Sequence, residues 1–465
     1  MGEAAPNPDC PGCQALLKRV ERLEREIREL RALQERNSSN SNRPPSSDSP
    51  SQRADRPSRP PSGRKPGGQA GHEAHLRALL PADQVTRHER RDPKSCRRCA
   101  ASLSGAKVLE PLRHQVVEIP EIVPDVTEYI LGRRCCGICN TVTAARLPKG
   151  VPQGMCGARL SSLIVLLTGA YHLSRRNTAS LLEDVLGVKL SLGSVSNVEG
   201  KMTAALSAAH SEALSCVRQA RVKHLDATSW SRSGEPSSLW TFASRLATVF
   251  VITASATAHT VQTVVGRMRG ILVSDRGSQF GFWAIEQRQI CWAHLTRRFT
   301  AFSESSRPEV QRLGEALLLL AHVHIVEWHR FCDGITTREQ LQEFVTKVEA
   351  LFVHHLERGV ALRQRKVSGA CANILRHKEA LFTYAFTMGV SPTNNHAERE
   401  LRAFVMWRKQ TAGTRSERGD RFAERVMTVV HTLRKHGRNV LSYLEQTFVA
   451  ALRGEPSPAL MPNGP

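Results

Sequence analysis

Three acidic residues, two that follow apolar strands and one in an amphipathic helix, constrain the fold of this chain most strongly. Asp226 follows the segment 221–225 and Asp275 follows the segment 270–274, and both segments are predicted as strands. The elements predicted around Asp275 are two strands at hairpin spacing, a helix, a short strand and a second helix: 239–243, 248–252, 259–269, 289–292 and 294–299. A buried strand that ends on an aspartate is where α/β sheets place functional groups, although either aspartate alone also fits a turn.

Glu398 is the third acidic residue, and it is expected in the first turn of a basic helix. Pro392 and Asn395 are helix start signals, and apolar residues recur at helical spacing after Glu398. A structural alternative stays open, because Asn395 and Glu398 have the spacing of an N-cap and its reciprocal glutamate, and Glu398 and Arg402 that of an ion pair. Three carboxylates from two strands and a helix can also hold two Mg²⁺ (or Mn²⁺) ions, which prefer oxygen ligands.

The charge balance predicts a polyanionic partner. Lys and Arg number 65 against 43 Asp and Glu, which leaves a net charge of +22 and a pI near 10.1. DNA is therefore the first expectation, with a generically basic surface as the alternative. No signal peptide is evident, and the longest apolar run, 160–171, is too short to span a bilayer. We expect a reducing cytoplasmic setting and no membrane partner.

Cysteine pairs in the segment 76–150 predict a structural zinc module. Two C-x-x-C pairs, separated by a β-rich stretch that includes 116–119 and 126–130, suit one tetrahedral Zn²⁺ through Cys96, Cys99, Cys136 and Cys139. Cys135 is a possible replacement ligand, and free buried thiols are the alternative. The pair Cys10 and Cys13 has no second pair and is interpreted as a turn with free thiols.

The remaining segments give the predicted domain order. Residues 1–36 carry a short coiled-coil seam, and 37–75 form a disordered basic Ser/Pro/Gly linker. Residues 155–215 contain three predicted helices in a helix-turn-helix-like order. The third would face DNA with Ser194, Ser196, Asn197 and Lys201, unless the helices only pack on one another.

The catalytic core is predicted in two parts, 220–303 and 391–450, around a helical insertion at 304–390, with a disordered tail at 451–465. Histidines in the insertion show no ligand pattern. Cys291 and His294 lie one helical turn apart and are expected to pack beside the carboxylates. The basic residues after Glu398 are suited to hold DNA phosphates: Arg399, Arg402, Arg408, Lys409, Arg415 and Arg418.

These motifs together resemble those of transposases of the insertion sequence 66 family, which are bacterial DDE enzymes. The resemblance runs from the coiled coil and the linker through the Cys pairs to 273–275, the Cys-Trp-Ala-His segment at 291–294 and the stretch from 394 to 444. It implies a ribonuclease H-like core with Asp226, Asp275 and Glu398 as the catalytic triad. One departure is Ala227, because the family usually reads Asp-Glu-Thr at this position.

The resemblance also implies an activity and its partners. Such an enzyme cleaves phosphodiester bonds at the terminal inverted repeats of its element and joins the 3′-OH ends to target DNA with two divalent cations. It would act as a homo-oligomer on DNA at the bacterial nucleoid, with accessory transposition proteins as further partners. The alternatives are a catalytically inactive DNA-binding protein or repressor, which Ala227 favours, and a structure-directed nuclease of the same fold.

Overall fold

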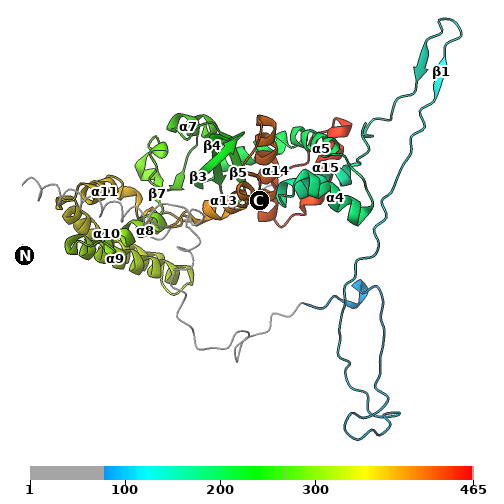
Figure 1. Cartoon of the computed structure of the whole chain (residues 1–465). Coiled ribbons are helices and arrows are strands. Elements are labelled where there is room, and N and C mark those ends of the chain that lie inside the picture. The colour runs from blue at the N-terminus through cyan, green and yellow to red at the C-terminus, as the bar shows by residue number, and fades with distance from the viewer. Residues whose placement is uncertain (1–77, 267, 463–465) are drawn as a thin grey trace, which may run out of the picture. The chain divides into compact units, whose positions relative to one another are not determined.

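The computed structural model describes residues 78–266 and 268–462 (Figure 1). The chain divides into two units, one of residues 53–125 and one of residues 1–52 and 126–465, and each is described by itself. This division falls inside the segment 76–150 that was predicted as one Cys-rich domain. The predicted coiled coil at 1–36, the linker at 37–75 and the pair Cys10 and Cys13 lie outside the described residues.

The described part of the smaller unit is mostly irregular chain. It contains the 3₁₀ turn η2 (Ala82–Gln84) and a tight turn in which Cys96 N donates to Ala101 O at 2.8 Å and Ala100 N donates to Cys96 O at 2.9 Å. The strand predicted at 116–119 does not form, and Val116 and Ile119 are 80% and 74% exposed. Alternating apolar residues without a partner strand do not make a sheet, so this prediction was wrong.

In the larger unit, the first element is a short hairpin of β1 (Arg133–Cys135) and β2 (Val142–Ala144). The strand predicted at 126–130 is extended chain outside any strand. The strand therefore starts several residues later than predicted, directly before the cysteine-containing turn that closes the hairpin.

A mixed five-stranded sheet forms the centre of this unit, in the order β5-β4-β3-β6-β7. Strands β3, β4 and β5 are antiparallel neighbours, whereas β6 pairs in parallel with both β3 and β7. The strand bounds are Val222–Arg232, Glu235–Ala243, Thr248–Thr253, Ile271–Ser274 and Arg288–Ile290. All five confirm strands predicted from the sequence.

Strand β3 is longer than predicted, so Asp226 lies within the strand and not at its end. The strand continues to Arg232 because Ser233 and Gly234 form a tight turn with φ of 52° and 91°, and β4 then pairs along the whole length of β3. Both central residues of this two-residue turn have positive φ, the conformation that matches the twist of antiparallel strands.

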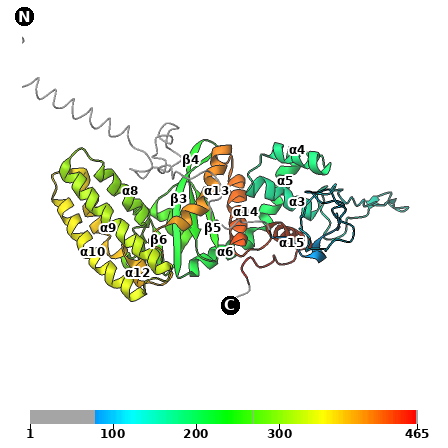
Figure 2. The ribbon, with the colours of Figure 1, turned by 90° about the horizontal axis from the view of Figure 1, so that it is seen from below.

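Helices flank the sheet (Figures 1 and 2). The helices before the sheet are α3 (Ala158–Val165), which continues into the π-helical η3 (Leu166–Ala170), α4 (Arg175–Leu186), α5 (Leu192–Ala205) and α6 (Ser207–Gln219). Helix α7 (Ala258–Val265) joins β5 to β6, and α8 (Trp292–Ser303) follows β7. Short 3₁₀ turns are η4 (Ser278–Phe280), η5 (Ile285–Gln287) and η6 (Lys378–Ala380).

The predicted helical insertion is confirmed as α9 (Pro308–Cys332), α10 (Arg338–Ala361), α11 (Arg365–Leu375) and α12 (Thr383–Phe386). It packs with α8 around its own hydrophobic core, which also takes in Val273 and Ile290 from the sheet. Figure 2 shows these helices on one side of the sheet and α4, α5, α14 and α15 on the other. In the described part of the chain, no helix combines the length and the apolar sequence of a membrane span.

Helix α14 (Glu417–Lys435) closes the exposed edge of the sheet. Three of its side chains, spaced four residues apart, accept hydrogen bonds from alternate backbone N–H groups of β5. The pairs are Ile252 N to Glu424 Oε1 at 2.6 Å, Phe250 N to Thr428 Oγ1 at 3.1 Å and Thr248 N to Thr432 Oγ1 at 3.2 Å. The helix thereby satisfies donors that would otherwise invite another strand.

The segment after α15 (Val440–Arg453) is packed, which corrects the prediction of a disordered tail in its described part. Leu460 is fully buried, and the backbone N–H groups of Leu460 and Met461 donate to Glu212 of α6 at 2.9 and 2.8 Å. Tyr443 Oη also donates to Pro458 O at 2.8 Å. The proline-rich composition of this segment gave no sign that Leu460 is buried in the hydrophobic core.

Helix α13 (Asn395–Thr411), which carries Glu398, is fixed to α14 by a buried charge cluster. Glu400 receives a hydrogen bond from His431 Nδ1 at 2.5 Å and an ion pair from Lys435 Nζ at 3.1 Å, and all three side chains are less than 17% exposed. Although burial opposes ionisation, the bond from His431 and the charge of Lys435 lower the pKa of Glu400 to about 2. The cluster therefore contributes stability only while Glu400 is ionised.

We predict that Glu400→Gln lowers the free energy of unfolding by about 3 kcal/mol at pH 7, because it leaves Lys435 buried without its counter-charge. The pKa of Glu400 is lower in the folded protein than its ordinary value of 4.5. Glu400 therefore contributes to stability above pH 4.5, and this contribution is lost as the pH falls toward 2. Urea denaturation between pH 7 and pH 3 should show the difference shrinking. Glu417→Gln, which removes an exposed pair with Arg421, is the control, and equal losses in both variants would contradict the prediction.

Candidate active site

The parallel pairing of β3 with β6 places Asp226 beside Asp275. His224 pairs with Val273, and each aspartate lies two residues further along the chain, Asp226 within β3 and Asp275 directly after the last residue of β6. Side chains two residues apart share a face of the sheet, and neighbouring strands lie about 4.8 Å apart, so both carboxylates project from the same face at adjacent positions. This juxtaposition was predicted from the order of strands.

Asp226 lies in a concentration of negative charge. Burial, together with the nearby carboxylates of Asp275 and Glu398, raises the pKa of Asp226 to about 7. Backbone groups fix both aspartates, since Ala227 N donates to Asp226 Oδ1 and Gly277 N to Asp275 Oδ1, each at 2.9 Å. Arg297 offsets part of this charge, and the neighbouring carboxylates still favour a cation.

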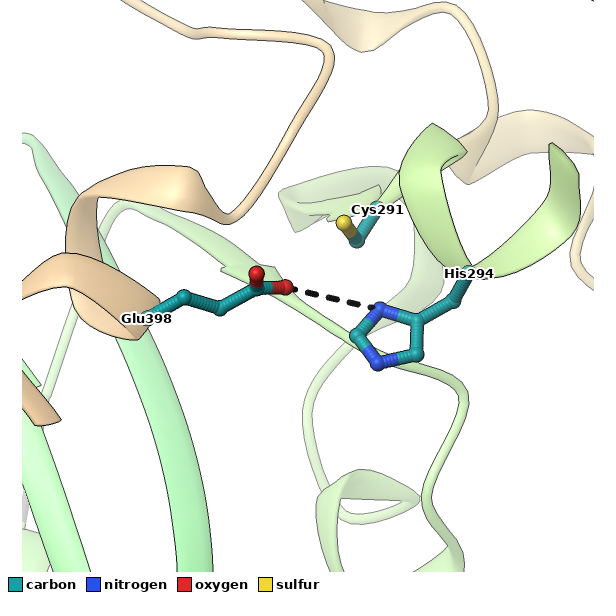
Figure 3. Close-up of side chains that lie close together, drawn as sticks. All are labelled: Cys291, His294 and Glu398. Carbon is teal, nitrogen blue, oxygen red and sulfur yellow. Dashed lines mark ion pairs between the residues drawn. The ribbon is translucent and has the colours of Figure 1, made fainter. Parts of the chain in front are cut away.

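Glu398 approaches the aspartates from the first turn of α13. Its Oε1 is buried and lies 3.9 Å from His294 Nδ1, and neither atom has a hydrogen-bond partner among the described residues (Figure 3). The N-cap is Asn394 without a side-chain bond to the helix, so the predicted cap at Asn395 was wrong. Among described residues, the basic side chain within 4.0 Å of the Glu398 carboxylate is His294, which pairs with it only if protonated, and not the predicted Arg402.

Asn394 joins the segments that carry the three carboxylates. This fully buried residue donates from Nδ2 to Leu225 O at 2.8 Å and from its backbone N to Cys291 Sγ at 3.1 Å. Its backbone oxygen accepts from Glu398 N at 3.2 Å. Cys291 N in turn donates to Ser274 O at 2.9 Å. Leu225 and Ser274, the residues directly before the two aspartates, are therefore both hydrogen-bonded to the pair of Asn394 and Cys291.

Sequence reasoning gave Asn394 no role. The available signal was weak, because paired asparagines before a helix also suggest an ordinary cap, and its partners lie 103 to 170 positions away in the sequence. The Oδ1 atom of Asn394 lies 3.2 Å from His224 Nδ1, and burial lowers the pKa of that histidine to about 4.

Cys291 and His294 lie beside Glu398, as predicted (Figure 3). One ligand atom from each of the three residues lies within 4.8 Å of the other two, and among the described residues this is the group of three metal-ligating side chains that the structure brings so close together. Burial raises the pKa of Cys291 to about 11 and lowers the pKa of His294, which keeps both groups neutral. Neutral neighbours leave the negative charge of Glu398 uncompensated.

The predicted DNA-contacting side chains of α13 differ in their surroundings. Arg399, Arg402 and Lys409 are exposed and available to a ligand. Arg408 is half-buried and donates from Nη1 to Thr228 Oγ1 at 3.2 Å and to Ser229 Oγ at 2.6 Å. Arg408 therefore attaches the helix to β3, in contrast to its three exposed neighbours.

Three of the four residues predicted to read DNA from α5 line a pocket, and Ser196 does not. Ser194, Asn197 and Lys201 line it together with Val198 and Arg418, while Val195 and Met202 are fully buried in the hydrophobic core. The predicted helices are confirmed as α3, α4 and α5, and their contact with DNA stays a prediction.

The four predicted zinc ligands lie in two turns, one in each unit. A hydrogen bond with the backbone of Cys99 lowers the pKa of Cys96, and a hydrogen bond with the Thr141 side chain lowers that of Cys139. Cys99, Cys135, Cys136 and Cys139 are exposed, so the alternative of free buried thiols does not hold for them. Zinc binding itself stays a prediction.

Comparison with known families gives two matches. Residues 153–421 match the model of the family described as "Transposase IS66 family", which spans all three carboxylates. Residues 12–78 match a family of unknown function (DUF6444).

Two curated relatives come from Sinorhizobium fredii. The uncharacterized protein y4hP is 24% identical over 379 residues, which cover 74% of this chain and 68% of that protein. The uncharacterized protein y4qI is 27% identical over 182 residues, which cover 37% of this chain and 33% of that protein.

Proposed function

We propose that this chain, which belongs to the IS66 family of transposases, cleaves phosphodiester bonds at the ends of an insertion sequence and transfers the 3′-OH ends to target DNA. The observation that supports the proposal is that Asp275 and Glu398 lie close enough to Asp226 to add to the effect of burial on its pKa, with Asp226 in β3, Asp275 directly after the neighbouring parallel strand β6 and Glu398 in α13. The strand order, with three antiparallel strands followed by two parallel ones, supports a ribonuclease H-like core.

The carboxylate centre has the donor set for Mg²⁺ or Mn²⁺. Its ligands would be the oxygens of Asp226, Asp275 and Glu398, and the buried, unpartnered Glu398 Oε1 is an open coordinating atom. Bound divalent cations activate the attacking hydroxyl and stabilise charge on the leaving oxygen in this class of reaction. Burial and the repulsion of the neighbouring carboxylates raise the pKa of Asp226, and a bound cation would favour its ionised form.

The protein's own residues position the reacting groups. Asn394 and Cys291 hold the three carboxylates in register, and the exposed Arg399, Arg402 and Lys409 bind backbone phosphates beside the centre. His294 borders Glu398 at 3.9 Å and limits its movement. Phosphate contacts of this kind orient a DNA strand and make its binding dependent on salt.

Ala227 does not argue strongly for an inactive protein. It packs against the hydrophobic core, and because side chains alternate along β3 it points to the face of the sheet opposite Asp226. A glutamate at this position would therefore not belong to the carboxylate face. The rival function, a DNA-binding repressor, is tested by whether the wild-type protein cleaves the DNA that it binds.

We further propose one structural zinc bound by Cys96, Cys99, Cys136 and Cys139. Metal analysis should find about one zinc per chain, and Cys96→Ser or Cys139→Ser should remove it because three thiolates bind the ion less tightly than four. Cys332→Ser, at an exposed thiol on α9, is the control. A folded wild-type chain without zinc would refute this proposal.

The catalytic assignment predicts that Asp226→Asn, Asp275→Asn and Glu398→Gln each abolish Mg²⁺-dependent strand cleavage, by at least about 10³-fold, because each removes a charged oxygen ligand. Binding to DNA from the element's end should be kept, as measured by gel shift beside the cleavage assay. Asp333→Asn, at an exposed site in the insertion, is the control and should cut normally. Full cleavage by any of the three amide variants would contradict the assignment, and a wild-type chain that binds but never cuts would favour the repressor.

A further inference from the structure

A pocket of about 410 Å³ adjoins the carboxylate centre and includes part of the helical insertion. The loop after β6, helix α8 and helix α11 all contribute to its wall. The lining residues are Asp275, Arg276, Gly277, His294, Arg298, Lys366, Ala370 and Asn373. Because Asp275 and His294 also border the carboxylate centre, a ligand in this pocket lies next to the reacting groups.

The pocket carries an excess of positive charge. Arg276, Arg298 and Lys366 face a single carboxylate, that of Asp275. Arg276 is anchored by a bond from Nη1 to Asn373 Oδ1 at 3.0 Å. Within the described residues, neither Arg298 nor Lys366 makes a hydrogen bond or an ion pair.

This arrangement favours an anion as ligand. Two guanidinium groups close to one another repel, and among the described residues no carboxylate lies within ion-pair distance of Arg298 or Lys366. Arginine side chains match the oxygens of a phosphate group, and a lysine adds a mobile point charge. The anion expected beside a phosphodiester-cleaving centre is the next phosphate of the same polymer.

We propose that this pocket binds a backbone phosphate of the DNA strand adjacent to the bond that is cut, with Lys366 and Arg298 as its ligands. The proposal rests on the proposed function and assigns the insertion a role in substrate binding. Lys366 comes from α11, so the insertion completes the site in addition to separating Glu398 from the aspartates along the chain.

The test is a coupling experiment on the full chain. Binding is measured with Asp226→Asn protein, which keeps the DNA uncut, and a duplex that spans the boundary of the chain's own insertion element. Lys366→Ala is compared with Lys347→Ala, an exposed lysine on α10 of the same insertion that is paired with Glu343. In the DNA, single phosphates near the boundary are replaced in turn by uncharged methylphosphonate.

Lys366→Ala should weaken binding about tenfold, the scale of one charge-assisted hydrogen bond, and should lower the slope of log K against log salt by about one. The loss should vanish with methylphosphonate at one position next to the cleaved bond, and Lys366→Arg should restore most of the affinity. Arg298→Gln should also weaken binding, and its effect should vanish with methylphosphonate at the same position. Lys347→Ala should show neither effect.

Two results would overturn the pocket assignment: Lys366→Ala binding like Lys347→Ala, or a loss spread evenly over all phosphate positions, which indicates only general surface charge. The proposed function is judged separately, by cleavage with wild-type protein and Mg²⁺. If Lys366→Ala couples to one phosphate position but the wild-type protein does not cleave DNA, the proposed enzymatic function is refuted and the phosphate pocket is kept. If the wild-type protein cleaves DNA but Lys366→Ala shows no such coupling, only the phosphate pocket is refuted.

Discussion

The hydrogen bonds of Asn394 and Cys291 are the interactions on which the geometry of the carboxylate centre depends. Asn394 bonds the strand residue before Asp226, Cys291 bonds the strand residue before Asp275, and the two residues bond each other. Glu398 lies one helical turn after Asn394, in the first turn of α13. Small displacements of this buried unit would therefore move all three carboxylates relative to one another, and metal sites tolerate little displacement.

The surrounding fold supports this unit from both edges of the sheet. On one edge, α14 binds the open N–H groups of β5 and fixes α13 through Glu400, so the helix that carries Glu398 is held by a second, independent contact. On the other edge, the insertion packs against the sheet through its own core and supplies α11 to the pocket next to Asp275. Elements far apart in sequence thus converge on a small site, while the exposed basic residues around it are available to a polyanion.

The sequence predicted the parts of this site that local pattern determines. Apolar runs located the five strands, and helical spacing located the Glu398 helix and the insertion, because burial of a periodic face leaves a direct signature. The length of β3 was missed because the Ser233–Gly234 turn is a weak two-residue signal. The strand predicted at 116–119 failed because alternation cannot reveal whether a partner strand exists. The role of Asn394 depends on contacts across 103 to 170 residues, which no local pattern contains.

Metal-directed backbone cleavage can show whether the three carboxylates form one divalent-cation site. Fe²⁺ replaces Mg²⁺ at oxygen sites, and with ascorbate and peroxide it generates radicals that cut the nearest backbone, so the fragments identify the ligands by mass. If the three carboxylates share one cation site, cuts are expected close to Asp226, Asp275 and Glu398 in the same sample, suppressed by excess Mg²⁺ and lost in Asp275→Asn. Cuts confined to the region of Cys291 and His294, or cuts at the aspartates that Mg²⁺ does not suppress, would contradict it.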